Sequence, residues 1–223
     1  MCNERKITVK GIGNLKLPVD WVKISFSLTS IDLDYNVGYE AFAKRISNLQ
    51  NAVASVGFKK DDLKSSVIRV RPNYRTIKHK SKGEEEYKQL FAGYSFESML
   101  VLSIPFDSKK LGDVLNAIAA SETDPNFDIQ FTVKDGEGAK NMLLAAAAKD
   151  AKTKAEILCS AAGAKLGKLY SISYNWEEIN IYSRTKYDMN TICDCVCENS
   201  PTVELSPEDV EVEDSATFVW DIE

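Results

Sequence analysis

The most strongly patterned part of the chain is the alanine-rich stretch 135–169. Apolar residues recur there at offsets of three and four, which predicts one long amphipathic helix. They are Leu144, Ala147, Ala148, Ala151, Ala155, Leu158 and Ala162. Because alanine side chains are small, we expect the helix backbone to lie tightly against a sheet. Gly163 and Gly167 are typical of residues that follow a last helical turn.

Two shorter helices are predicted by the same periodicity. The first covers residues 36–56, with Asp34 or Asn36 as its N-cap. The second is short and begins at Asp107 or Ser108.

Alternation of apolar and polar residues predicts the strands. They cover residues 6–13, 21–31, 67–77, 90–104, 127–133, 169–176 and 215–222. We expect the first two to be antiparallel neighbours. Strands 67–77 and 90–104 form a long hairpin whose charged tip is 78–89, and Pro72 indicates an edge strand or a bulge.

This order of elements predicts an α+β fold, in which helices pack on one side of a largely antiparallel sheet. We expect a single domain over residues 6–222. Within it, residues 177–214 are acidic and poorly periodic, and are interpreted as a variable, cysteine-containing excursion.

Charge and hydropathy narrow the possible partners. Lys and Arg number 28 against 33 Asp and Glu, a formal net charge of -5. Mild acidity argues against nucleic acid as a partner, and no apolar run approaches the roughly 20 residues that a membrane span requires. The chain as given begins without a leader pattern, so we expect a cytoplasmic location. If a leader was removed, a periplasmic location or a lipid anchor at Cys2 is the alternative.

The cysteines offer the one candidate chemical cluster. Cys193, Cys195 and Cys197 alternate, which places three thiols on one side of an extended segment. Such thiols bind zinc or copper, or cycle between redox states. The only histidine, His79, is distant in sequence, and neighbouring acidic residues disfavour the thiolate form. Incidental loop cysteines are the alternative, and an odd total of five cysteines favours a reducing compartment.

Other residue patterns point to structure rather than catalysis. His79 lies between lysines in the hairpin tip, and the acidic run 84–86 is typical of a solvated hairpin end. The GIG sequence at 11–13 follows a strand but opens no helix, so it lacks the context of a dinucleotide site. We therefore predict no catalytic residue and no bound cofactor.

Several segments, taken in order, resemble the SIMPL domain family, also called DUF541. The segments are ITVKGIGNLKLPVDWVKISFSL, VGFKKDDLKSSVIRVRPNY, GYSFESMLVLSIP and AAAAKDAKTKAEILCSAAGAKLGKLYSISY. The family includes bacterial periplasmic or outer-membrane-associated proteins linked to oxidative stress, a ring-forming bacterial antigen and a vertebrate kinase-binding signalling protein. The resemblance implies an α+β fold and self-association, and it implies no catalytic motif.

The leading hypothesis is a non-enzymatic interaction or self-assembling protein. Its sheet edges and the hairpin 67–104 are expected to join copies into a homo-oligomer, with other proteins as further partners. The alternative is a thiol-redox or metal-binding protein that uses Cys193, Cys195 and Cys197.

Overall fold

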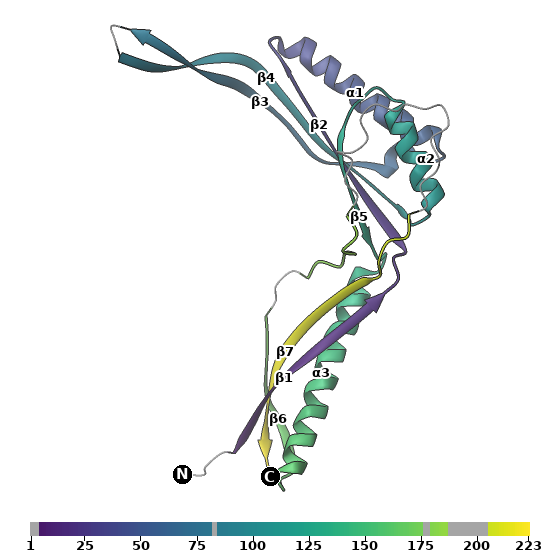
Figure 1. Cartoon of the computed structure of the whole chain (residues 1–223), viewed down its shortest axis with the longest axis vertical. Helices are drawn as coiled ribbons and strands as arrows, with labels where there is room; N and C mark the ends of the chain where they lie inside the picture. The colour runs from purple at the N-terminus through teal and green to yellow at the C-terminus, as the bar shows by residue number, and fades with distance from the viewer. Residues whose placement is uncertain (1–4, 82–83, 176–178, 187–204) are drawn as a thin grey trace. The chain divides into compact units, whose positions relative to one another are not determined.

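The computed structural model describes residues 5–81, 84–175, 179–186 and 205–223. Its elements form two antiparallel sheets and three α-helices, so the predicted α+β class is confirmed (Figure 1). The strands form two sheets rather than the one sheet expected. The chain divides into two compact units, each with its own sheet, and they are described separately below. The single-domain expectation for residues 6–222 stays a prediction.

Unit 1 comprises Met1–Trp21, Phe131–Thr185 and Pro207–Glu223. Its strands are β1 (Lys6–Leu17), β6 (Leu166–Tyr174) and β7 (Val210–Ile222), in the order β1-β7-β6. β7 therefore lies between the other two, and pairs with β1 from Lys6 opposite Asp221 to Leu17 opposite Val210. β7 begins five residues earlier than alternation predicts, inside the expected excursion 177–214.

The long helix α3 (Gly136–Ala161) packs on this sheet, as predicted. The Asp135 carboxylate caps it by accepting the Gly138 amide at 2.8 Å, and Gly163 follows its end with a φ of 71°. The expectation for Gly167 is wrong, because this residue lies in β6.

The row of buried residues along α3, called the α3 seam below, is shifted by one position from the predicted apolar face in part of the helix. It advances in strict steps of four through Ala139, Leu143, Ala147, Ala151, Ala155 and Cys159. Leu158, expected in the seam, is 53% exposed, and Leu144 is only half-buried. Residues four apart on a helix are separated by about 400°, so each step moves the buried position about 40° around the helix axis. The seam therefore rotates along α3 and follows the twist of the strands beneath it.

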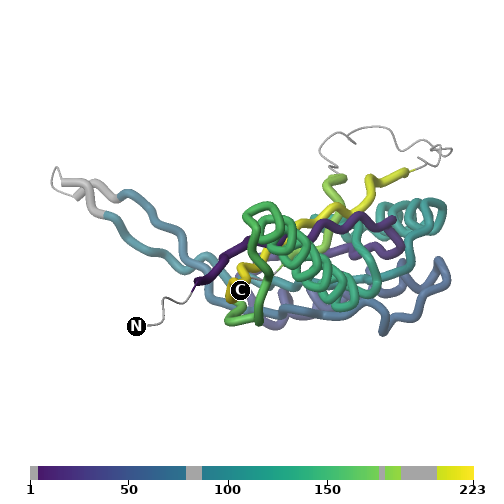
Figure 2. The backbone as a smooth tube through the Cα atoms, turned by 90° about the horizontal axis from the view of Figure 1, so that it is seen from below, coloured from purple at the N-terminus to yellow at the C-terminus, as the bar shows by residue number. Residues whose placement is uncertain are grey.

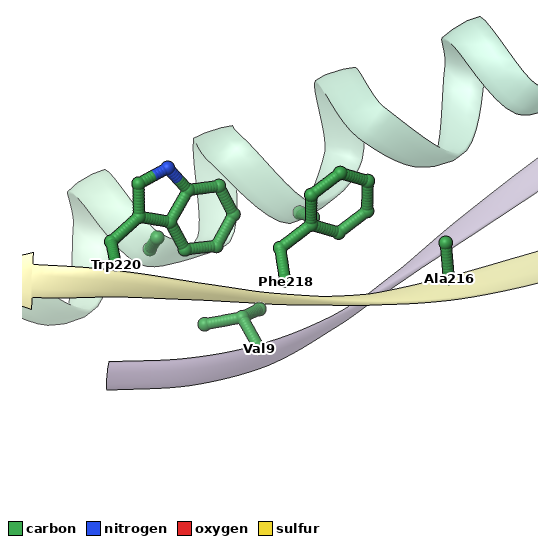
Figure 3. Close-up of a cluster of buried hydrophobic side chains, with 6 residues drawn as sticks. Val9, Ala216, Phe218 and Trp220 are labelled. Carbon is green, nitrogen blue, oxygen red and sulfur yellow. The ribbon is translucent and has the colours of Figure 1, made fainter. Parts of the chain in front are cut away.

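Small residues let α3 approach β1 at backbone distance. The core beside it contains Val9 and a stacked pair, Phe218 and Trp220, whose ring centroids are 5.5 Å apart (Figure 3). A Cβ placed on Gly11 or Gly13 would overlap a carbonyl oxygen of α3. The GIG sequence therefore serves helix–strand packing.

Two carboxylates tie unit 1 together across its elements. Asp150 on α3 accepts the β1 amide of Ile12 at 2.8 Å and the Lys154 ammonium at 2.6 Å. The Lys154 hydrogen bond, followed by that of the amide, lowers the pKa of Asp150. Tyr174 on β6 donates to Asp214 on β7 at 2.7 Å, and this bond raises the pKa of the phenol.

Unit 2 comprises Val22–Gln130 and Lys186–Ser206. Its helices are α1 (Tyr35–Ser55) and α2 (Ser108–Ala119), with a 3₁₀ turn at Lys60–Asp62. Its strands are β2 (Trp21–Asp32), β3 (Leu63–Ser81), β4 (Glu84–Pro105) and β5 (Asn126–Thr132), in the order β3-β4-β2-β5. β1 and β2 thus belong to different sheets, so their predicted pairing is wrong. An alternating pattern of apolar and polar residues predicts a strand, but it does not predict which other strand pairs with it.

Both helices of unit 2 begin and pack largely as predicted. Asp34 and Asp107 are the N-caps, each accepting amides of the first turn. α1 contacts β4, where Phe42 packs on Phe96, and it also contacts α2. The buried faces consist of Gly38, Phe42, Leu49, Ala52 and Val53 on α1, and of Leu111, Val114 and Ile118 on α2.

The predicted hairpin is confirmed and is longer than expected. β3 and β4 pair from Leu63 opposite Leu102 to Ser81 opposite Glu84 and extend beyond α1 as a two-stranded ribbon (Figures 1 and 2). The expected charged tip 78–89 is therefore mostly strand. Pro72 lies on β3, which is the edge strand of the sheet as predicted.

Candidate interaction surface

The predicted thiol site falls outside the described structure. Cys193, Cys195 and Cys197 are not among the described residues, so the metal and redox hypotheses stay predictions. Within the part that is described, Cys159 is a free, buried thiol on the α3 seam, and no group of His, Cys, Asp and Glu has a metal-binding arrangement. His79 pairs through its backbone with Glu86 in the hairpin.

Two open hollows in unit 1 are lined by groups of both charge signs. One, of about 340 Å³, lies at the start of α3, where Lys140 pairs with Glu137 at 3.5 Å. The other, of about 560 Å³, includes Lys16, Arg184 and Glu211. In the first hollow Lys134 and Lys140 balance Asp135 and Glu137, so it favours no ion of one sign. The second has three carboxylates, those of Glu208, Asp209 and Glu211, against the cations of Lys16 and Arg184, so it keeps a small acidic excess.

Exposed large apolar side chains are concentrated in unit 2, around the base of the hairpin. From the end of β2 to the first turns of α1, every second residue is one of them. These residues are Ile31, Leu33, Tyr35, Val37 and Tyr39. Leu33 is the most open, at 72% exposure, and Val37 is 58% exposed. Burying such side chains is favourable by about 25 cal/mol per Å², so this segment is a strong candidate for a contact with another molecule.

An aromatic row joins this segment to the hairpin. Tyr35 stacks on Tyr39 with ring centroids 6.2 Å apart and meets Tyr94 of β4 edge-on at 5.4 Å. Tyr94 contacts Phe91 at 5.2 Å, and Phe91 contacts Tyr74 of β3 at 5.8 Å. We call these five residues the aromatic row. It is continuous from α1 to the outer part of the hairpin, and it is half-exposed or exposed along its length.

Gly93 permits this arrangement. Its φ is 106°, and a Cβ there would overlap the carbonyl group of Asp32, so the β2–α1 connection rests directly on the β4 backbone. The close approach brings Tyr35 over Tyr94.

The opposite face of the ribbon is basic. Alternation places Arg69, Arg71 and Arg75 on the face away from Phe96, which is buried under α1. All three arginines are exposed, and we call them the arginine face. The hairpin is therefore two-sided, with aromatic rings on one face and guanidinium groups on the other.

Unit 1 carries exposed acidic residues where β7 begins. Glu211 and Glu213 lie on one face of the strand, and Asp209 immediately precedes it. Lys16 of β1 bonds Glu211 at 2.9 Å and lies 3.7 Å from Asp209. These contacts raise the pKa of Lys16, chiefly through Glu211, and the hydrogen bond from Lys16 lowers the pKa of Glu211.

Comparison with models of protein families shows the family to which the chain belongs. The model of SIMPL, a protein family of unknown function (DUF541), matches residues 7–220. The chain belongs to the SIMPL family. This confirms the resemblance drawn from the quoted segments, and the match spans both units of the SIMPL fold described above. A search of curated proteins finds no match.

Part of the surface of this SIMPL protein was visible in the sequence and part was not. The hairpin was predicted, but the apolar segment 31–39 was divided between a strand and a helix, and its exposure was missed. The available signal was the alternation of Ile31, Leu33, Tyr35 and Val37 straight through a helix start, where the helical period should take over. No helix in the described part of the chain is long and apolar enough to cross a membrane.

Proposed function

We propose that this SIMPL protein is a non-enzymatic interaction protein that self-associates through the aromatic row and the exposed segment 31–39. The observation that carries the proposal is the continuity of exposed apolar side chains from Leu33 through Tyr35 and Phe91 to Tyr74. Contiguous exposed apolar surface on a soluble protein marks contact sites, whereas isolated exposed residues do not.

The composition of the surface supports a protein partner. Tyrosine and phenylalanine are enriched at interfaces because each buries a large area while losing few rotamers. The tyrosine hydroxyls keep such a surface soluble when it is uncovered.

The edge of β3 is a weaker candidate than the aromatic row. Pro72 removes one edge amide, and arginines and lysines alternate along the strand. Proline and positive charge are devices that protect sheet edges from pairing with another chain. The contact therefore rests on the face of the ribbon rather than on added strand hydrogen bonds.

Light scattering coupled to size exclusion tests the proposal over a range of protein concentrations. The wild-type chain is expected to form oligomers, and the double variant Leu33→Lys, Tyr74→Lys is expected to dissociate about tenfold more readily, since about 1.4 kcal/mol corresponds to that ratio. Ile157→Lys is the matched control, because Ile157 is 61% exposed but lies on α3 in unit 1. A wild-type chain that is monomeric at every concentration, or a control that dissociates equally, contradicts the proposal.

A further inference from the structure

Charge is distributed unevenly along the chain. The hairpin residues 63–105 contain eight Lys and Arg against four Glu, whereas residues 177–214 contain eleven Asp and Glu against two Lys and Arg. The weak overall charge of -5 therefore hides a basic part and an acidic part. Surfaces of opposite sign steer association and fix its register.

The basic part presents its charge at strand spacing. Arg69 and Arg71 are two residues apart on one face of β3, opposite Glu97 and Ser95 of β4. Residues two apart on a strand lie roughly 6.6 to 6.8 Å from one another. Arg75 continues the same face two steps further along.

The acidic part has the same spacing. Glu211 and Glu213 are two residues apart on β7, and both are exposed. Val210, Ala216 and Phe218, on the other face of β7, are buried against the core. The carboxylates therefore point to the uncovered side of this three-stranded sheet, and their separation matches that of the two arginines.

Like charges exclude the simplest symmetric contact through these arginines. A twofold contact in which two arginine faces meet would place guanidinium against guanidinium, because an isologous interface repeats the same patch on both copies. A heterologous contact, in which the arginine face of one copy meets the acidic strand of another, places opposite charges together. Such head-to-tail contacts close into rings or extend as filaments.

We propose that the arginine face of the β3–β4 hairpin binds the acidic face at the start of β7 in a second copy of the chain. This inference rests on the self-association proposed above and adds a second contact, made by the opposite face of the same hairpin. Arginine suits this role, since its planar guanidinium bonds a carboxylate through two parallel N–H groups. Lys16 bonds Glu211 from one side, and Glu213 is exposed two residues further along the same face of β7.

Charge exchange within one chain tests the inference. The first variant carries Arg69→Glu, Arg71→Glu and Arg75→Glu, and the second carries Glu211→Lys and Glu213→Lys. Each is expected to weaken self-association about tenfold or more at low salt. The combined variant, with all five substitutions, is expected to regain association to within about threefold of wild type, because both faces have changed sign together.

The combined variant separates this inference from its rivals. Self-association through the aromatic row alone predicts no loss of association in the first variant, and therefore no recovery in the combined variant. A nucleic-acid partner predicts that a fluorescent single-stranded oligonucleotide binds the wild type and not the first variant, again without recovery. Either result overturns the inference.

Separate controls distinguish a misfolded variant, and a failure of the proposed self-association, from a failure of the charge pairing. Circular dichroism shows whether the Glu211→Lys, Glu213→Lys variant is folded. The neutral variant Glu211→Gln, Glu213→Gln shows whether loss of the two carboxylates alone weakens association. The neutral variant is expected to fold and to associate less tightly than wild type, and unchanged association would contradict the inference. A monomeric wild type would refute the proposed self-association itself, whereas an oligomeric wild type without recovery in the combined variant refutes only the charge pairing.

Discussion

Gly11→Ala is expected to destabilise unit 1 strongly, although alanine is ordinarily the better strand residue. The added Cβ would overlap the Ala147 carbonyl oxygen and lie 2.6 Å from the Ala151 Cβ. Over-packing of a close-packed core costs about 1 to 3 kcal/mol. The upper value applies here, because the obstacle is helix backbone that no rotamer change can move.

A small opposing term reduces the net effect. Replacing a strand glycine by alanine otherwise stabilises by roughly 0.5 to 1 kcal/mol. The free energy of unfolding should therefore fall by about 2 to 2.5 kcal/mol, and Tm by about 4 to 10 °C for a chain of this size.

Tryptophan fluorescence during urea unfolding measures this change in unit 1. Trp21 and Trp220 belong to unit 1, and residues 22–130 contain no tryptophan. Gly136→Ala is the matched control, because nothing lies within 4 Å of a Cβ at Gly136 and its stability should be unchanged or raised by up to about 1 kcal/mol. A Gly11→Ala midpoint equal to that of wild type would refute the claim that α3 and β1 pack at backbone distance.

Three further predictions concern buried or bridging polar groups. Arg45→Met should destabilise unit 2 by about 2 kcal/mol in thermal unfolding followed by far-ultraviolet circular dichroism, because Arg45 donates to the carbonyl oxygen of Thr123 at 2.7 Å; an unchanged Tm would contradict this. The pKa of Asp150 is lowered by Lys154, so its contribution to stability is present above the ordinary aspartate pKa and is lost as pH falls through the lowered value; urea midpoints between about pH 5 and pH 2.5 should decline less in Asp150→Asn than in wild type. The pKa of Tyr174 is raised, so its contribution is complete below the ordinary tyrosine pKa of about 10 and is lost as pH rises through the raised value; Tyr174→Phe should remove this part of the alkaline decline, and identical alkaline profiles would show that the hydrogen bond contributes nothing.

Local signals in the sequence were sufficient for the elements and their caps. Asp34 and Asp107, both among the predicted N-caps, each supply a carboxylate to amides of a first helical turn, and this chemistry acts over a few residues. Asp135 caps α3 in the same way but was not predicted to do so. Pro72 marked an edge strand because proline lacks the amide that a central strand needs.

Contacts between segments that are distant in the sequence could not be predicted from local patterns. β1 finds its partner in β7, at the other end of the chain, and no local pattern distinguishes this pairing from one with β2. The choice of Leu143 over Leu144 for the α3 seam depends on the twist of the strands below it, which is a property of the assembled sheet. The exposure of Leu33 was missed because hydrophobicity predicts burial only on average, although the alternation that continues into the start of α1 was an available signal.

The position of β7 sets the order in which this protein can fold during synthesis. All four strands of the unit 2 sheet lie within residues 21–132, so this sheet can form while translation proceeds. β1 precedes these strands in the chain, yet its partner β7 follows all of them, so β1 remains unpaired until β7 has been made. A premature stop codon just before residue 210 would therefore leave both β1 and β6 without their partner strand, whereas loss of the first few residues of β1 would shorten only one edge strand.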